Sequence, residues 1–323
     1  MGAQRIRGKA HSGVSSAVAA KNVARDINMN ADYVSRIQHL VSLSTRRKTS
    51  NILEGGFPSV YRGRSLEFED LRDYVFGDEV HDIDWKSSSR AGKALIRRYV
   101  AEKKQYVLFL SDSGAKMTAD TSAGESKSDL CMMTFGVMAY LLDRQGADFA
   151  MTCAGRRGAV DSAFHSGRSH IEELIRQYRQ EALRTGESDI GALAGDAVDR
   201  FRRHMVLVLL TDLHGIAQLS ERVIRKLTVS CDVRVVNLED AYLTGSNVFD
   251  VQRNRYVDDF FLASRALQEA ERRERVRLLG EAQALFRRYH VGLVTIARES
   301  EIVDRTIRLF RADEAIMKRT ERE

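Results

Sequence analysis

Short apolar runs alternate with stretches of helical periodicity from about residue 105 onward. Each run is short and almost continuously apolar, which is typical of a strand covered on both faces. The predicted strands are 106–112, 147–154, 205–212, 231–239 and 291–297. The predicted helices are 126–146, 169–184, 190–203, 218–228, 263–289 and 300–312. This alternation predicts an α/β fold with a mostly parallel sheet and helices on both faces.

The chain before residue 105 follows a different pattern. Residues 1–26 are rich in Gly, Ser, Ala and Lys and are predicted to form a basic flexible tail. Apolar side chains recur at helical spacing over 31–47, which predicts an amphipathic helix. Residues 51–100 combine glycines and dense charges with many apolar side chains, which favours an ordered, turn-rich segment. The predicted regions are a tail at 1–26, the helix and turn-rich segment at 27–104, and an α/β domain at 105–323.

The positive charge is concentrated at the start of the chain. The formal net charge is +6, but the first fifty residues carry +7 and the remainder −1. A basic tail of this kind is one alternative route to nucleic-acid binding. It has few aromatic residues to stack on bases and no recognition motif, so nucleic-acid binding is not expected as the main function.

Several functional classes lack their sequence signals. No apolar run is long enough to span a bilayer, and the basic start has no apolar core of a signal peptide, so we expect a cytoplasmic protein. The three cysteines, at 131, 153 and 231, lie far apart in apolar stretches and are expected to be buried thiols. Neither a phosphate-binding loop nor a nucleophile elbow occurs, so we expect no enzymatic activity.

The turn-rich segment carries glycines, charges and aromatic residues at fixed spacing. It reads GFPS at 56–59, RGRSLEF at 62–68, LRDY at 71–74, GD at 77–78, IDW at 83–85 and arginine at 90. This series resembles the signature of the DUF58 family, apart from Ser65, His81 and Ser89, where the family commonly has glycine, arginine and alanine. The resemblance marks as structural or partner-binding Ser59, Arg62, Glu67, Phe68, Arg72, Tyr74, Gly77, Asp78, Asp84, Trp85 and Arg90.

Charges this dense are expected to pair with one another or with backbone amides. The pairs then act as a structural clamp, or they hold a partner-docking surface that displays Trp85 and Arg90. An alternative is a metal-dependent hydrolase or nuclease that uses Asp78, Asp82 and Asp84. Against it, on an extended strand Asp82 and Asp84 share one face while His81 points away.

The resemblance to DUF58 implies a von Willebrand A-like, Rossmann-type domain, and such domains can hold Mg²⁺ at the carboxyl edge of the sheet. Their ligands come from a D-x-S-x-S turn, a threonine in a later loop and an aspartate after a middle strand. Here the turn carries Asp112, Gly114 and Lys116, Ser188 replaces the threonine, and Asp212 supplies the later carboxylate. Lys116 is expected to occupy the place of the ion and to repel a divalent cation, so neither a metal nor another cofactor is expected.

The resemblance also implies a role in recognition. Proteins of this family are associated with MoxR-type AAA+ ATPases, for which they are thought to serve as adaptors. We therefore expect a non-enzymatic protein that bridges a MoxR-type ATPase to an unknown client protein. The two contact surfaces are expected to be the signature segment and the rim around Asp112, Lys116, Ser188 and Asp212.

Overall fold

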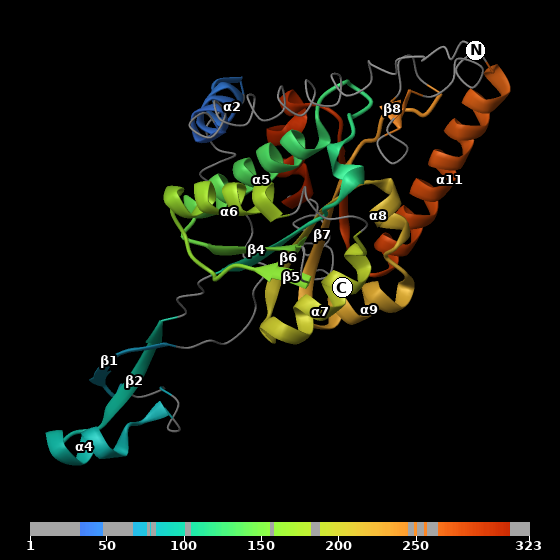
Figure 1. Ribbon diagram of the computed structural model, residues 1–323. Helices are drawn as coiled ribbons and strands as arrows, with labels where there is room; N and C mark the ends of the chain where they lie inside the picture. The colour runs from blue at the N-terminus through green and yellow to red at the C-terminus, as the bar shows by residue number, and fades with distance from the viewer. Residues whose placement is uncertain are drawn as a thin grey trace, which may run out of the picture. The chain divides into compact units, whose positions relative to one another are not determined.

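A computed structural model describes ten stretches of the chain and separates it into two units (Figure 1). One unit, called the sheet unit, comprises residues 1–58 and 106–323; the other, the inserted unit, comprises 59–105. The described residues are 33–47, 67–75, 78, 82–100, 105–155, 158–181, 188–244, 249–250, 255–256 and 264–310. Ser59, Arg62 and Gly77 of the predicted signature, and the predicted tail at 1–26, lie outside them.

The sheet unit is built on a six-stranded sheet with the order β10-β7-β6-β3-β4-β5. All neighbouring strands pair in parallel except β5, which runs antiparallel to β4 at one edge. The strands are β3 (Tyr106–Ser111), β4 (Asp148–Gly155), β5 (Gly158–Asp161), β6 (Met205–Thr211), β7 (Cys231–Leu238) and β10 (Gly292–Ile296). The α/β class predicted from the alternating pattern is therefore confirmed.

Helices cover both faces of this sheet, as Figure 1 shows, with α2, α5 and α6 on one side and α7 and α9 on the other. The central strands β3 and β6 are almost wholly buried, which explains their continuous apolar sequences. The helices are α2 (Tyr33–Arg47), α5 (Lys127–Asp143), α6 (Arg168–Glu181), α7 (Ile190–Phe201), α8 (Leu213–Ala217), α9 (Glu221–Ser230) and α11 (Arg265–Arg288). The remaining elements are the 3₁₀ turns η2 (Ala115–Thr118) and η4 (Glu299–Glu301), a helix over 302–310, and the short strands β8 (Phe249–Asp250) and β9 (Arg255–Tyr256).

Helix α2 packs on the outside of α5. Tyr33 and Ile37 are buried, and a Cβ atom at Gly136 of α5 would overlap the Ile37 side chain, so glycine permits the close approach. The Tyr33 hydroxyl donates a hydrogen bond to Asp129 Oδ1 at 2.6 Å. The sequence grouped this helix with the turn-rich segment in 27–104, whereas its packing groups it with the sheet. Because α5 is covered by the sheet and by α2, it is apolar around nearly its whole circumference.

The inserted unit contains an antiparallel pair of strands and a short helix. These are β1 (Glu67–Asp73), β2 (Leu95–Val100) and α4 (Trp85–Ala91). The register shifts by one residue between Phe68 and Asp70. Ile83 forms an isolated bridge with Ile96, and both side chains are buried. The turn-rich segment therefore folds as a small unit of its own.

Candidate functional site

The carboxyl ends of β3 and β6 bring two buried aspartates together. Asp112 follows β3, Asp212 follows β6, and each is only 1% exposed. These neighbouring strands lie where the chain turns toward opposite edges of the sheet, because β4 follows β3 on one side and β7 follows β6 on the other. Ligands of doubly wound sheets bind at this switch point. We call Asp112, Asp212 and the side chains that contact them the rim.

Lys116 reaches into the rim from η2. Its Nζ lies 2.7 Å from Asp112 Oδ2 and 3.9 Å from Asp212 Oδ1, and its side chain is 17% exposed. The ammonium makes no hydrogen bond of good geometry with another described residue, so the contact is an electrostatic pair. A positive charge therefore lies between two carboxylates, where a cation would balance them.

The turn before Lys116 has a backbone that only glycine adopts readily. Gly114 has φ 91° and ψ −175°, a region that side chains with a Cβ atom avoid at a cost of about 1–3 kcal/mol. The D-x-S-x-S pattern has a serine at this position. The lost hydroxyl is therefore accompanied by a backbone conformation that disfavours serine.

Both carboxylate oxygens of Asp112 have partners within the protein. The backbone amide of Ser113 donates to Oδ1 at 2.8 Å, and the Ser188 hydroxyl also contacts Oδ1. On the other side, the Thr211 hydroxyl donates to Oδ2, which also faces Lys116. The predicted group of Asp112, Gly114, Lys116, Ser188 and Asp212 is thus brought together, with Thr211 added by the structure.

A second lysine, Lys127, was missed by the sequence analysis. It is the first residue of α5, it is 1% exposed, and its Nζ lies 2.7 Å from Asp212 Oδ2. It also donates a hydrogen bond to Asp240 Oδ1, beyond the end of β7. One signal was present in the sequence, because a lysine directly after the Ser126 cap is unfavourable beside the positive end of a helix and needs a partner. Lys127 therefore ties α5 to the ends of β6 and β7.

Burial and nearby charges have opposite effects on the pKa values of Asp212 and Lys127. Burial alone would raise the pKa of Asp212, but the nearby charges of Lys127 and Lys116 and their contacts hold it below its ordinary value. Burial likewise opposes the charged form of Lys127, yet Asp212 and Asp240 raise its pKa. The pKa of Asp240 is raised by burial and by the neighbouring Asp212. Around neutral pH, Asp212 and Lys127 are therefore both charged.

Helix α11 holds the segment that carries Asp240. Arg275 donates hydrogen bonds to the carbonyl oxygens of Asp240, at 2.8 Å, and Ala241. Glu271 accepts from the backbone amides of Leu243 at 2.7 Å and Thr244 at 3.0 Å. The rim is therefore joined to α11 through a continuous series of polar contacts.

In the inserted unit, part of the signature forms the expected charge pairs. Arg72 binds both oxygens of Asp78, at 2.7 and 2.8 Å, and the Val75 amide donates to the same carboxylate at 2.9 Å. Hydrogen bonds from Arg72 and Val75 lower the pKa of Asp78. Asp84 caps α4 by accepting from the Ser87 amide at 2.9 Å. Arg72, Asp78 and Asp84 thus hold the backbone of this unit.

The remaining signature residues are only partly described. Glu67 and Phe68 lie on β1, Tyr74 follows this strand, and its amide donates to the Ala94 carbonyl at 3.0 Å. Trp85 and Arg90 are exposed on α4. Asp84 begins a helix, so the face shared with Asp82 on an extended strand does not form, and His81 lies outside the described residues. Across the described stretches, no three His, Cys, Asp or Glu side chains form a group suited to a metal ion.

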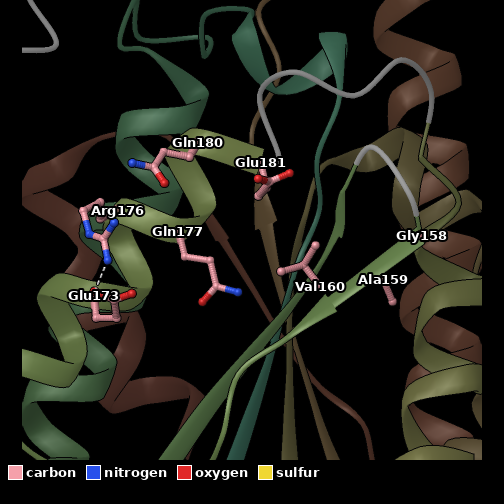
Figure 2. A pocket seen from close by; sticks show the side chains of 8 residues that line it. All are labelled: Gly158, Ala159, Val160, Glu173, Arg176, Gln177, Gln180 and Glu181. Carbon is pink, nitrogen blue, oxygen red and sulfur yellow. Dashed lines mark hydrogen bonds and ion pairs between the residues drawn. The ribbon is translucent and has the colours of Figure 1, made fainter.

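A cavity of about 560 Å³ lies away from the rim, between α6 and the edge strand β5. Figure 2 shows the side chains of α6 on one side of it and the strand on the other. Its lining is mostly polar, and the charged pair Arg176–Glu173 is formed within α6 itself. None of the residues expected at the functional site lines this cavity.

The described residues contain no helix that is long and apolar enough to cross a bilayer. All three cysteines are buried and unpaired, as the sequence indicated.

The chain is similar to several known proteins over part of its length. An uncharacterized protein of Mycobacterium tuberculosis and another of Mycobacterium bovis are each 24% identical over 178 residues, which cover 54% of this chain and 56% of theirs. This chain therefore spans about half the length of these relatives. Similar solved structures include BatB of Bacteroides thetaiotaomicron (TM-score 0.39, 13% identity, 63% of this chain and 99% of that one). Another is an aerotolerance-related membrane protein of Bacteroides fragilis (TM-score 0.41, 13% identity, 64% and 99%).

The family model described as "Protein of unknown function DUF58" matches residues 70–251. The match covers more than half of the chain, and it includes the second part of the signature as well as the ends of β3, β6 and β7. The chain belongs to the DUF58 family.

Proposed function

We propose that this protein is a non-enzymatic adaptor that bridges a MoxR-type AAA+ ATPase to a client protein. One surface is the signature segment of the inserted unit, and the other is the rim of the sheet unit. The observation that carries the proposal is the position of the Lys116 ammonium, 2.7 Å from Asp112 and 3.9 Å from Asp212. A rim whose carboxylates are neutralised from within recognises partners without a metal ion.

Electrostatics supports a metal-independent rim. A divalent ion between the two aspartates would lie beside Lys116 and close to Lys127, and in a buried site such repulsion is only weakly screened. The ion would also have to replace the hydroxyl groups of Ser188 and Thr211 on Asp112. Mg²⁺ prefers near-octahedral oxygen ligands, and this arrangement leaves few of them available.

The absence of an ATP-binding motif from the sequence supports a partner that supplies energy. No G-x-x-x-x-G-K-S/T sequence occurs in the chain. In the DUF58 family, which this chain resembles in its signature, the associated partner is a MoxR-type ATPase. The energy of ATP hydrolysis would come from that partner, and the adaptor would supply recognition of the client.

Calorimetry with Mg²⁺ and Mn²⁺ tests the metal-independent rim. We expect no saturable binding to the wild-type protein at millimolar concentrations of either ion, because Lys116 and Lys127 already balance the carboxylates. Lys116→Ala removes one ammonium and should increase the affinity for Mn²⁺. Tight binding by the wild type that is lost in Asp112→Asn would refute this part of the proposal.

Association with a purified MoxR-type ATPase from the same organism tests the adaptor role. Arg72→Ala should weaken association several-fold, because Arg72 holds Asp78 and the adjacent turn. A matched control is Lys93→Ala in the same unit, where the ion pair with Asp73 is exposed on both sides. Equal association of well-folded wild type and Arg72→Ala would count against the signature segment as the contact surface.

The alternative of a metal-dependent hydrolase or nuclease has a direct test. Asp84 would be a ligand in that alternative, whereas here it caps α4. A nuclease assay with divalent ions on wild type and Asp84→Ala separates the two functions, because only a nuclease loses cleavage in the variant.

A further inference from the structure

The indole of Trp85 is exposed although the inserted unit has an interior of its own. Trp85 is the only tryptophan of the chain, and its side chain is 67% exposed at the first position of α4. Among the described side chains of this unit, the buried apolar ones are Ile83 and Ile96. Tryptophan is enriched among the anchors of protein interfaces.

Helix α4 is held rigidly by polar contacts. Asp84 accepts a hydrogen bond from the Ser87 amide at 2.9 Å, and the Asp84 amide donates to the Leu95 carbonyl at 2.9 Å. The Ser88 hydroxyl, which is buried, accepts from the Leu95 amide at 2.8 Å. Because these contacts are all made within the inserted unit, they hold the backbone of α4, which carries Trp85. A fixed anchor loses little conformational freedom when it binds.

Two exposed cations lie on the same short helix as Trp85. Lys86 and Arg90 are one helical turn apart and exposed, and on a helix they lie opposite the buried Ser88. In the part of the chain that the structure describes, neither forms an ion pair. We call Trp85, Lys86, Ser89 and Arg90 the tryptophan face. An apolar anchor with unpaired cations at its border is complementary to an apolar pocket bordered by carboxylates.

We propose that the tryptophan face docks into an apolar pocket bordered by Asp and Glu side chains on the MoxR-type ATPase. This inference rests on the proposed function, because the ATPase is the partner named there. The indole fills the pocket, while Lys86 and Arg90 pair with the carboxylates around it. Indole burial provides most of the affinity, and the charges provide orientation and faster association.

The charge pattern around this face disfavours single-stranded nucleic acid. Binding without sequence preference uses a continuous basic groove and several aromatic platforms. Here Asp82 and Asp84 precede the helix that carries the two cations, so acidic and basic residues lie close together along the chain at this point.

A single tryptophan makes a selective spectroscopic test possible. Protein labelled with 5-fluorotryptophan gives one ¹⁹F resonance, which reports only on Trp85, whatever tryptophans the partner contains. In the free protein, iodide should quench Trp85 emission more strongly than caesium, because the indole is exposed on a helix that carries two cations. On addition of the purified ATPase, the resonance should shift and broaden.

Variants measure the contribution of each part. We expect Trp85→Ala to weaken binding of the ATPase at least tenfold, and the double variant Lys86→Glu/Arg90→Glu to weaken it and reverse its dependence on salt. Val229→Ala is the matched control, because Val229 is an exposed apolar residue on α9 of the sheet unit, and it should leave binding unchanged. Circular dichroism checks that each variant is folded.

The possible failures are distinguishable. If the ATPase binds wild type and Trp85→Ala equally and the ¹⁹F resonance does not change, the docking face is refuted while the adaptor role stands. If the ATPase does not bind the wild type at all, both the proposed function and the ATPase as the partner of the tryptophan face are refuted. A shift produced by oligothymidylate but not by the ATPase would overturn the inference in favour of nucleic acid. Weak quenching by iodide would show that the indole is covered, which also overturns it.

Discussion

The rim of the sheet unit and the charge pairs of the inserted unit use the same residue types with different consequences. In the rim, Lys127 and Asp212 are almost completely buried, so their charges depend on each other. In the inserted unit, Lys93 and Asp73 form a similar pair, at 2.6 Å, but more than half of each side chain is exposed. Water screens and solvates the second pair, whereas the first has only protein around it. We therefore expect the buried pair to contribute much more to stability than the exposed one.

The largest expected effect is the loss of one partner from the buried set. Lys127→Met should destabilise the sheet unit by about 3–5 kcal/mol, because it removes the nearest cation from the buried Asp212 and from the partly buried Asp240. Urea denaturation followed by circular dichroism measures this change. Lys93→Met is the control from the exposed pair and should change the free energy of unfolding by no more than about 0.5 kcal/mol. Similar effects of the two variants would contradict the comparison.

Acidification should weaken the rim to a smaller extent. The pKa of Asp212 is lower in the folded protein than in the unfolded chain, so its stabilisation is complete above the unfolded value, near 3.8, and is lost as the pH falls through the lower folded value. Asp240, with its raised pKa, takes up a proton first and partly offsets this loss. Denaturation at pH 7 and pH 3 should therefore show a greater loss of stability for wild type than for Asp212→Asn. An equal loss in both proteins would mean that Asp212 is not coupled to the lysines.

The smallest effect concerns one glycine in each unit. Gly114, before Lys116, has a backbone conformation that is almost restricted to glycine, and Gly114→Asn should cost about 1–3 kcal/mol. Gly92 ends α4 in the left-handed helical region, at φ 67° and ψ 15°, which asparagine tolerates. Gly92→Asn should therefore cost less than about 1 kcal/mol. Thermal unfolding of both variants tests the difference, which disappears if the turn at Gly114 adapts freely.

The central sheet was predictable because its strands are buried on both faces. The continuous apolar run MVLVLLT at 205–211 is fully buried in β6, so its sequence alone predicts a central strand. The edge strand β5, at 158–161, was not predicted because most of its residues are exposed and its four residues give no distinct pattern. The predicted helix at 218–228 corresponds to α9, but the preceding short helix α8 was missed.

Most residues of the rim could be found from the sequence. Asp112, Lys116, Ser188 and Asp212 were found because they align with the metal-site pattern of von Willebrand A-like domains. Lys127 belongs to no such pattern. Its partner Asp240 is 113 residues away, so only the folded chain brings the two together.

The strands β1 and β2 of the inserted unit were not predicted from the sequence. Strand β1 reads EFEDLRD, in which charges occupy most positions on both faces, and the register shift between Phe68 and Asp70 interrupts the alternation of side chains. The expected pairing of signature charges was correct for Arg72 and Asp78, which are close in sequence. Such local pairs are easier to predict than the partner strand, which begins at Leu95.

The insertion of residues 59–105 between α2 and β3 places two covalent connections between the units. One of them leads directly into Tyr106 at the start of the central strand β3, so a partner that pulled on the inserted unit, as proposed above, would pull on this strand. That strand is hydrogen-bonded in parallel to both β4 and β6, so tension along its axis is shared by two ladders at once. The far end of the same strand leads to Asp112, so β3 connects the point of insertion directly to the rim.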